Sequence, residues 1–174
     1  MVASGKFLGI MVSQQGIEAN PEKVRAILEM TSPRIVKEVK KLTGRIVAFN
    51  MFVSKAMKKC LPFFKTLKQA FTWTEECKKA FQELKRYLSN PSLLSPLKEG
   101  ENLFLYIAVL ATAISAALIQ EENKVQLSVY YISQAFQGAE AKYPQIEKIA
   151  FTLIVASRKL CPYFQANPIM VMID

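Results

Sequence analysis

The stretch Glu101-Asn-Leu-Phe-Leu-Tyr-Ile-Ala108, followed by Ala113-Ile-Ser-Ala-Ala-Leu-Ile-Gln120 and Val129-Tyr-Tyr-Ile-Ser133, decides the fold of the second half of the chain. Each segment is a short apolar run bounded by polar or turn residues, which is typical of buried strands. The runs predict an antiparallel meander with strands near 102–109, 113–120 and 126–133.

A helix and a last strand are predicted after this meander. The helix covers about 145–160, and its apolar spacing predicts a buried face. That face comprises Ile146, Ile149, Ala150, Leu153, Ile154 and Ser157. Three strands, a helix and a strand suit an enzyme core that holds metal ions on carboxylates. These elements nevertheless carry only one acid on an internal face, Asp174, so the chain looks like the framework of a nucleic-acid enzyme without its chemistry.

The first half of the chain reads differently. A short strand at 7–13 and a turn at Gln14-Gln-Gly16 precede a helical array over 21–90. Helix-start signals recur at Asn20-Pro21, Ser32-Pro33, Pro62 and Thr74. A linker with two prolines and a glycine follows at 91–100. The sequence therefore predicts an α+β fold in three segments: a hairpin at 1–20, helices at 21–90 and an α+β unit at 91–174.

Charge is divided unevenly between the two halves. Residues 1–90 hold 17 Lys and Arg against 7 Asp and Glu, a net of +10, whereas residues 91–174 hold 6 against 7, a net of −1. Lys37, Lys40, Lys41 and Arg45 share one face of a predicted helix. This distribution is consistent with two interpretations: a surface that meets a polyanion, or a solvated helical face.

Composition excludes several classes of function. The chain has no histidine, which excludes Ser-His and Cys-His nucleophiles and histidine-based metal sites. Its three cysteines, Cys60, Cys77 and Cys161, show no metal-binding spacing and favour an intracellular protein of cytoplasm or nucleus, not a secreted one. The 17 uncharged residues at 103–119 are better explained by paired strands than by a membrane span, and we expect no membrane association.

The ordered series of motifs resembles the reverse transcriptase and RNase H-like region of gypsy-type LTR retrotransposon Pol polyproteins, in the form common in plants. Phe7-Leu-Gly-Ile-Met-Val-Ser13 resembles the end of the palm, and Lys37-Glu-Val-Lys-Lys-Leu-Thr-Gly-Arg45 resembles the thumb helix. Phe71-Thr-Trp-Thr-Glu-Glu-Cys77 is similar to the entry into the RNase H-like domain, and Arg158-Lys-Leu-Cys-Pro-Tyr-Phe164 fits that domain. The resemblance covers nearly the whole chain and implies a truncated RNase H-like domain at 91–174.

Most of the catalytic Asp and Glu residues of this family are missing from the chain. No Tyr-x-Asp-Asp motif is present, and most of the palm and fingers would lie upstream of Met1. The resemblance places the RNase H acids at Ala108, Ile149 and Asp174, with a fourth beyond the last residue. Two divalent ions need several carboxylates. We therefore expect no intact catalytic site, no metal site and no cofactor in this chain, although the parent family uses Mg²⁺.

The resemblance also implies which functions remain. The hairpin with Phe7, Leu8 and Gly9 resembles the primer grip, and Lys37, Lys40, Lys41 and Arg45 fall on the thumb. We expect weak, sequence-independent binding of RNA–DNA or DNA duplex, and contact with the palm and fingers of a longer polyprotein. The alternative is a non-catalytic protein-interaction module derived from a transposable element.

Overall fold

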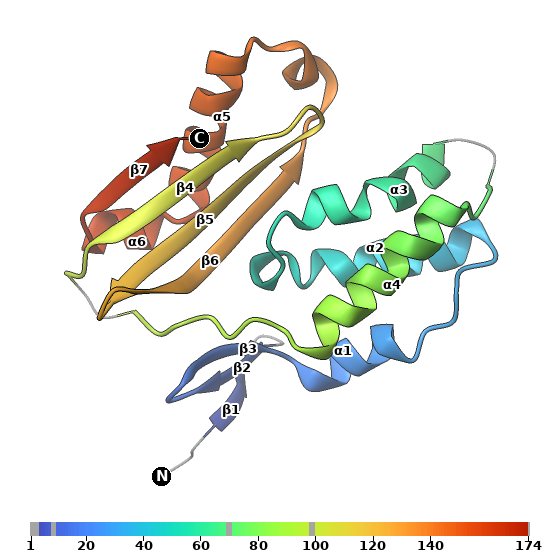
Figure 1. Cartoon of the computed structure of the whole chain (residues 1–174), viewed down its shortest axis with the longest axis horizontal. Coiled ribbons are helices and arrows are strands. Elements are labelled where there is room, and N and C mark those ends of the chain that lie inside the picture. The colour runs from blue at the N-terminus through green and yellow to red at the C-terminus, as the bar shows by residue number, and fades with distance from the viewer. Residues whose placement is uncertain (1–3, 8–9, 69–70, 98–99, 174) are drawn as a thin grey trace.

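The computed structural model describes residues 4–7, 10–68, 71–97 and 100–173. Three parts are visible in Figure 1: a small hairpin sheet, a group of helices and a larger four-stranded sheet backed by two helices. The predicted α+β class is therefore confirmed. No helix in the described part of the chain is both long enough and apolar enough to span a membrane.

The hairpin sheet has three short antiparallel strands: β1 (Ser4–Phe7), β2 (Ile10–Ser13) and β3 (Gly16–Ala19). The prediction of one strand over 7–13 was wrong, because Phe7 pairs with Ile10 at the end of an antiparallel ladder. Leu8 and Gly9 lie outside the described residues. Gly16 has φ +141°, as its predicted place in a turn requires.

The helical part contains α1 (Pro21–Leu28), α2 (Val36–Val47), the short η1 (Asn50–Phe52), α3 (Ala56–Lys68) and α4 (Glu75–Ser89). The predicted caps are confirmed at Asn20, which accepts from the Glu22 N–H, and at Thr74, which accepts from the Cys77 N–H. Phe52, Phe63 and Phe81 are among the largest fully buried side chains of this core.

Two of the predicted helix starts were wrong. Ser32-Pro33 precedes α2 by several residues, and α2 begins at Val36 after Ile35, which provides no side-chain cap. Pro62 lies inside α3 rather than at its first turn, because the helix already begins at Ala56. A proline within a helix costs one backbone hydrogen bond. The buried side chains of α3, Cys60 and Phe63, stand on both sides of Pro62 and hold this helix against the core.

The larger sheet has the strand order β6-β5-β4-β7. Its strands are β4 (Leu103–Val109), β5 (Ala113–Glu122), β6 (Val125–Ala135) and β7 (Ile169–Ile173). The predicted meander is confirmed, because β4 and β6 both pair antiparallel with β5. β7 runs parallel to β4, with Ile107 opposite Ile173. The run that resembled a membrane span is therefore the β4–β5 hairpin.

Helix α5 (Gln145–Lys159) packs on one face of this sheet and is followed by α6 (Cys161–Ala166), as Figure 1 shows. The predicted buried face of α5 was partly wrong: Thr152 and Ala156 are fully buried, whereas Ile146 is 72% and Ile154 is 49% exposed. Short side chains allow the helix to approach the strands closely. The Thr152 hydroxyl donates to the Lys148 carbonyl at 2.6 Å, which satisfies it within the helix.

Strand β7 is an edge of the sheet. It is hydrogen-bonded to β4 on one side, and no described strand pairs with its other side. Four successive apolar side chains on it are exposed: Met170, Val171, Met172 and Ile173. The opposite edge strand, β6, lies next to the helical part in Figure 1.

Hydrogen bonds between described residues join the parts at several places, of which two bear on the predictions. At the junction of helices and sheet, the Asn50 side chain donates to the Ser133 carbonyl at 2.9 Å, and the Met57 N–H donates to the Ser133 hydroxyl at 3.0 Å. At the hairpin, Ile17 and Leu94 exchange backbone hydrogen bonds of 2.9 and 3.0 Å. Within the predicted linker at 91–100, the segment 91–97 is fastened to the hairpin, and Leu94 is fully buried.

Candidate nucleic-acid interface

The basic face of α2 forms because the helix has two distinct sides. Val39, Leu42, Thr43 and Ile46 are buried against the other helices. Lys37, Lys40 and Lys41 lie on the remaining arc and are exposed. Three of the four predicted phosphate-binding side chains are therefore together on one accessible helix face, where they can reach phosphates without leaving a core position.

A groove of about 540 Å³ lies between α1 and α2. Lys40, Lys41 and Arg45 line it from α2, and Lys23 lines it from α1. The small residues Ala26, Gly44 and Ala48 also line it, together with Phe49. Glu22, at the rim, is paired with Lys6 at 2.7 Å, and this hydrogen bond and the Lys6 charge lower the pKa of its carboxyl. The lining of the groove is thus predominantly basic.

Lys23 was not among the predicted binding residues. No local signal identified it, because its place beside the α2 lysines depends on how α1 packs against α2. The charge of the helical half was recognised in the sequence, but the pairing of two helices is a tertiary property.

Arg45 lines the groove beside Lys40 and Lys41 and also contacts α1. Its guanidinium donates to the Ala26 carbonyl at 2.5 Å and contacts the Met30 sulfur at 4.0 Å. Ala26 is in the last turn of α1, where carbonyls have no partner within the helix. Arg45 therefore joins α2 to α1 and supports the groove, and one of its donors is already used by the protein.

The structure describes only part of the predicted primer grip. Phe7 is the last residue of β1, and its side chain, like the whole of Leu8 and Gly9, lies outside the described residues. Their contribution to binding therefore stays a prediction.

The positions of the missing acids lie on two different elements. Ala108 is in β4, opposite Ser115 of β5, and Ile149 is in α5. A hollow of about 420 Å³ on the sheet contains Ala108, with Met172 and Ile173 of β7 and Lys55 before α3, and Ile149 is not part of its lining. Asp174, the third predicted position, lies outside the described residues.

The donor set around Ala108 does not fit a divalent metal ion. Magnesium is bound through carboxylates and phosphates, whereas Ala108 and Ile149 offer hydrocarbon side chains. Among the described residues, no three His, Cys, Asp or Glu side chains form a group that could hold a metal ion. The catalytic state of the chain stays a prediction.

The family described as "RNase H-like domain found in reverse transcriptase" matches residues 73–171. The chain belongs to this family.

Relatives along the whole chain are retrotransposon polyproteins. The Retrovirus-related Pol polyprotein from transposon opus of Drosophila melanogaster is 29% identical to the chain and covers 97% of it. The Pol polyprotein from transposon 412 of the same fly is 27% identical, and the transposon Tf2-3 polyprotein of Schizosaccharomyces pombe is 22% identical. The chain spans 18%, 14% and 13% of these relatives, respectively. It is thus similar to a reverse transcriptase and RNase H-like region of Pol polyproteins.

Solved structures share the fold of nearly the whole chain. The foamy viral protease-reverse transcriptase in complex with RNA/DNA hybrid matches with a TM-score of 0.78 and 22% identity, over 98% of this chain and 24% of that one. The same protein in complex with dsDNA matches with a TM-score of 0.77, over 99% and 37%, respectively. The helices and the sheet are therefore arranged as in that enzyme.

Proposed function

We propose that this chain binds duplex nucleic acid through the α1–α2 groove, without sequence preference and without cutting it. The observation that carries the proposal is the gathering of Lys23, Lys40 and Lys41 around one open groove, with Lys37 on the same helix face. Phosphate contacts need positive charge and donors and no particular base sequence.

Two further observations support a duplex as the ligand. The foamy viral structures with the same fold are complexes with RNA/DNA hybrid and with dsDNA. The small residues Ala26, Gly44 and Ala48 between the lysines leave room for a sugar–phosphate backbone to approach the helices. In a longer polyprotein, the palm and fingers would pack beside this surface. Duplex binding would then extend over both parts.

The gypsy-type assignment is also part of the proposal. It rests on the ordered motifs of the sequence, from Phe7 to Phe164. The relatives named above come from a fly and a fission yeast and give no support for a plant origin. An intracellular location in cytoplasm or nucleus remains an expectation from composition alone.

The test of binding is fluorescence anisotropy of labelled RNA–DNA hybrid across a salt series. Four phosphate contacts, from Lys23, Lys37, Lys40 and Lys41, predict a slope of log K against log salt of about −3.6. A Lys40→Ala, Lys41→Ala double variant is expected to reduce this slope by about 2 units. The matched control removes two exposed charges from the sheet half, Lys142→Ala with Lys159→Ala, and is expected to keep the wild-type slope. A flat wild-type salt response would contradict the proposal.

The expected lack of RNase H activity is tested by a cleavage assay on an RNA–DNA hybrid with Mg²⁺. We expect no cleavage above the buffer control, because Ala108 and Ile149 supply no carboxylate. We also expect none after Ala108→Asp with Ile149→Glu, since two ions need further ligands. Magnesium-dependent cleavage by the wild-type chain that disappears in Asp174→Asn would show that an active site is present.

A second candidate function is a protein-interaction module. The four successive exposed apolar side chains of β7 favour it, because contiguous exposed apolar surface often marks a contact region. Wild-type binding that lacks any salt dependence, together with a stable protein complex, would favour this candidate over the first.

A further inference from the structure

A basic groove lies between α3 and α4, separate from the α1–α2 groove. Its volume of about 580 Å³ is in the range of small-molecule sites. The charged residues of its lining are Lys55, Lys58, Lys59, Lys79, Glu76 and Glu83. Four lysines around one groove of this size form a concentrated positive region, which suits a compact anion.

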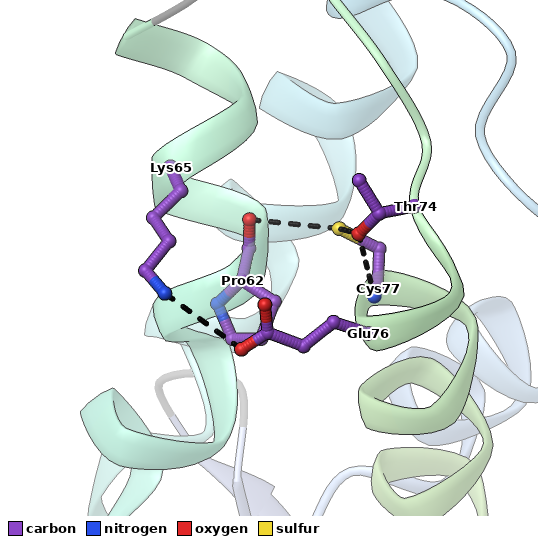
Figure 2. Close-up of polar contacts among 5 residues, drawn as sticks. All are labelled: Pro62, Lys65, Thr74, Glu76 and Cys77. Atoms are coloured by element: carbon purple, nitrogen blue, oxygen red, sulfur yellow. Dashed lines mark hydrogen bonds and ion pairs between the residues drawn. The ribbon is translucent and has the colours of Figure 1, made fainter.

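The two acids reduce this positive charge only in part. Glu76 forms an ion pair of 3.7 Å with Lys65, across α3 and α4 (Figure 2). Because Lys65 is not part of the lining, it offsets the Glu76 charge without engaging a lysine of the groove. Glu83 acts on Lys59, where its charge favours the protonated amine. The lysines therefore remain in excess within the groove.

A contact between the two helices joins the walls of the groove. The Cys77 thiol of α4 donates to the Pro62 carbonyl of α3 at 3.6 Å, and the Cys77 N–H donates to the Thr74 hydroxyl, as Figure 2 shows. Cys77 is buried in the helical core, whereas Pro62 also lines the groove. The buried contact, and not the charged side chains, therefore sets the spacing of the two walls.

Lys59 differs from an exposed lysine in its position and in its protonation. It is half-buried, and its ammonium lies 3.8 Å from the centre of the Tyr87 ring, a cation–π contact. The Tyr87 hydroxyl donates to the Phe52 carbonyl at 2.9 Å, which fixes the ring. Burial lowers the pKa of Lys59 and exceeds the opposing effect of Glu83. Lys59 is thus held in place and loses its proton more readily than an exposed lysine.

The groove combines a nucleophile with positive charge. An amine attacks a carbonyl carbon only in its neutral form, so an amine with a lowered pKa is the better nucleophile at neutral pH. Acyl phosphates are compact anions in which a reactive carbonyl carbon is bonded to a phosphate oxygen. Lysine ammonium groups bind phosphate as point charges, and three further lysines line the groove beside Lys59. One groove thus offers both features that an acyl phosphate requires.

We propose that Lys59 is an acylation site and that the α3–α4 groove directs acyl phosphates to it through the neighbouring lysines. The neutral Lys59 amine attacks the carbonyl carbon, and a C–N bond replaces the C–O bond to phosphate. Inorganic phosphate leaves with the proton that the amine loses, so no other reactant is needed. The acylated Lys59 carries no charge and loses its cation–π contact with Tyr87. This site is independent of the proposed duplex binding.

The first experiment compares an anionic and an uncharged acetyl donor on the full chain. Acetyl phosphate and acetic anhydride are applied separately, without nucleic acid, and acetylation of each lysine is followed by mass spectrometry. The measured quantity is the rate at Lys59 divided by the rate at the exposed Lys159. We expect this ratio to be several-fold higher with acetyl phosphate than with acetic anhydride. Equal ratios with the two donors would overturn the proposal.

Competition by inorganic phosphate tests whether the groove binds the phosphate of the donor. Added phosphate is expected to lower the Lys59 to Lys159 ratio for acetyl phosphate to the value found with acetic anhydride. Sodium chloride at the same ionic strength is the control and should lower the ratio less, because it screens charge without occupying a phosphate site. An equal effect of the two salts would show that no phosphate site directs the reaction.

The second experiment removes two lysines of the groove. Lys58→Gln with Lys79→Gln is expected to lower the Lys59 to Lys159 ratio several-fold with acetyl phosphate and to leave it unchanged with acetic anhydride. Lys124→Gln with Lys142→Gln removes the same charge outside the groove and is expected to leave both ratios unchanged. Equal effects of the two variants would overturn the proposal. If the groove variant also changes the anhydride ratio, its fold is altered, and the phosphate competition on the wild-type chain decides.

Discussion

The α-carbon of Gly16 faces the backbone carbonyl of Leu94 so closely that an added Cβ would lie 2.1 Å from the Leu94 oxygen. Gly16 also has φ +141°, which side-chain-bearing residues rarely adopt. Because the neighbouring Ile17 exchanges two backbone hydrogen bonds with Leu94, the segment cannot move away without losing them.

Gly16→Ala is therefore expected to lower the free energy of unfolding by roughly 2–4 kcal/mol, through steric overlap and backbone strain. Urea denaturation followed by circular dichroism measures this change. The control is Gly5→Ala in β1, where an added Cβ meets nothing within 4 Å. Equal stability of the two variants would contradict the role of the Gly16–Leu94 contact.

Ser133→Ala is expected to destabilise the junction between the helices and the sheet. The variant removes the acceptor of the Met57 N–H at a buried position, which costs about 1–3 kcal/mol. Urea denaturation measures the loss. Ser89→Ala, which removes an exposed hydroxyl at the end of α4, should change stability by less than about 0.5 kcal/mol.

Arg45→Ala is expected to act on stability as well as on binding. The loss of the charged hydrogen bond to the Ala26 carbonyl predicts a decrease of about 1–2 kcal/mol in the free energy of unfolding. Lys41→Ala on the same helix should leave stability nearly unchanged and affect only the salt slope of duplex binding. The thermal midpoints of both variants check this contrast. A destabilised Lys41→Ala beside an unchanged Arg45→Ala would contradict it.

The three cysteines are expected to differ in reactivity. Cys161 is exposed, whereas Cys60 and Cys77 are buried. Burial raises the pKa of the Cys60 thiol to about 12, so it stays protonated and unreactive at neutral pH. Iodoacetamide at pH 8 should therefore modify one thiol of the folded chain and three in urea, as counted by mass spectrometry. Rapid native modification of Cys60 would contradict this.

The raised pKa of Cys60 also determines whether the stability of the fold rises or falls with pH. Above about pH 8.5, the thiol ionises in the unfolded chain but keeps its proton in the folded chain. The unfolded state then binds fewer protons, so the Cys60 contribution lowers stability as pH rises towards about 12. Urea denaturation at pH 8 and pH 10 should show a smaller pH-dependent decrease for Cys60→Ala than for the wild-type chain.

The sheet was predictable from sequence and the helix packing was not. Buried strands such as Leu103–Val109 give apolar runs that turn residues interrupt, so their bounds are visible locally. Helix α5 carries apolar residues around most of its circumference, and periodicity alone does not show that Thr152 and Ala156 face the sheet. The start of α3 was missed because Pro62, a usual first-turn residue, stands in its interior.

The sequence predicted that the candidate site is positively charged, but it predicted the arrangement of the charged side chains only in part. The exposed positions of Lys37, Lys40 and Lys41 follow from helical spacing on one amphipathic helix. The position of Arg45 against Ala26 and the place of Lys23 beside the α2 lysines depend on contacts between helices. Such contacts join residues far apart in the chain, so no window of sequence contains them.

The unpaired side of β7 has a practical consequence for anyone who prepares this chain. An edge strand with exposed Met170, Val171, Met172 and Ile173, and with neither proline nor charge among them, is a template for further strands. The net positive charge lies in residues 1–90, away from β7 in the sequence. Charge repulsion between two chains that meet at β7 is therefore expected to be weak. Concentrated samples are expected to form oligomers at β7, and one lysine in place of Val171 should be enough to keep the chains apart.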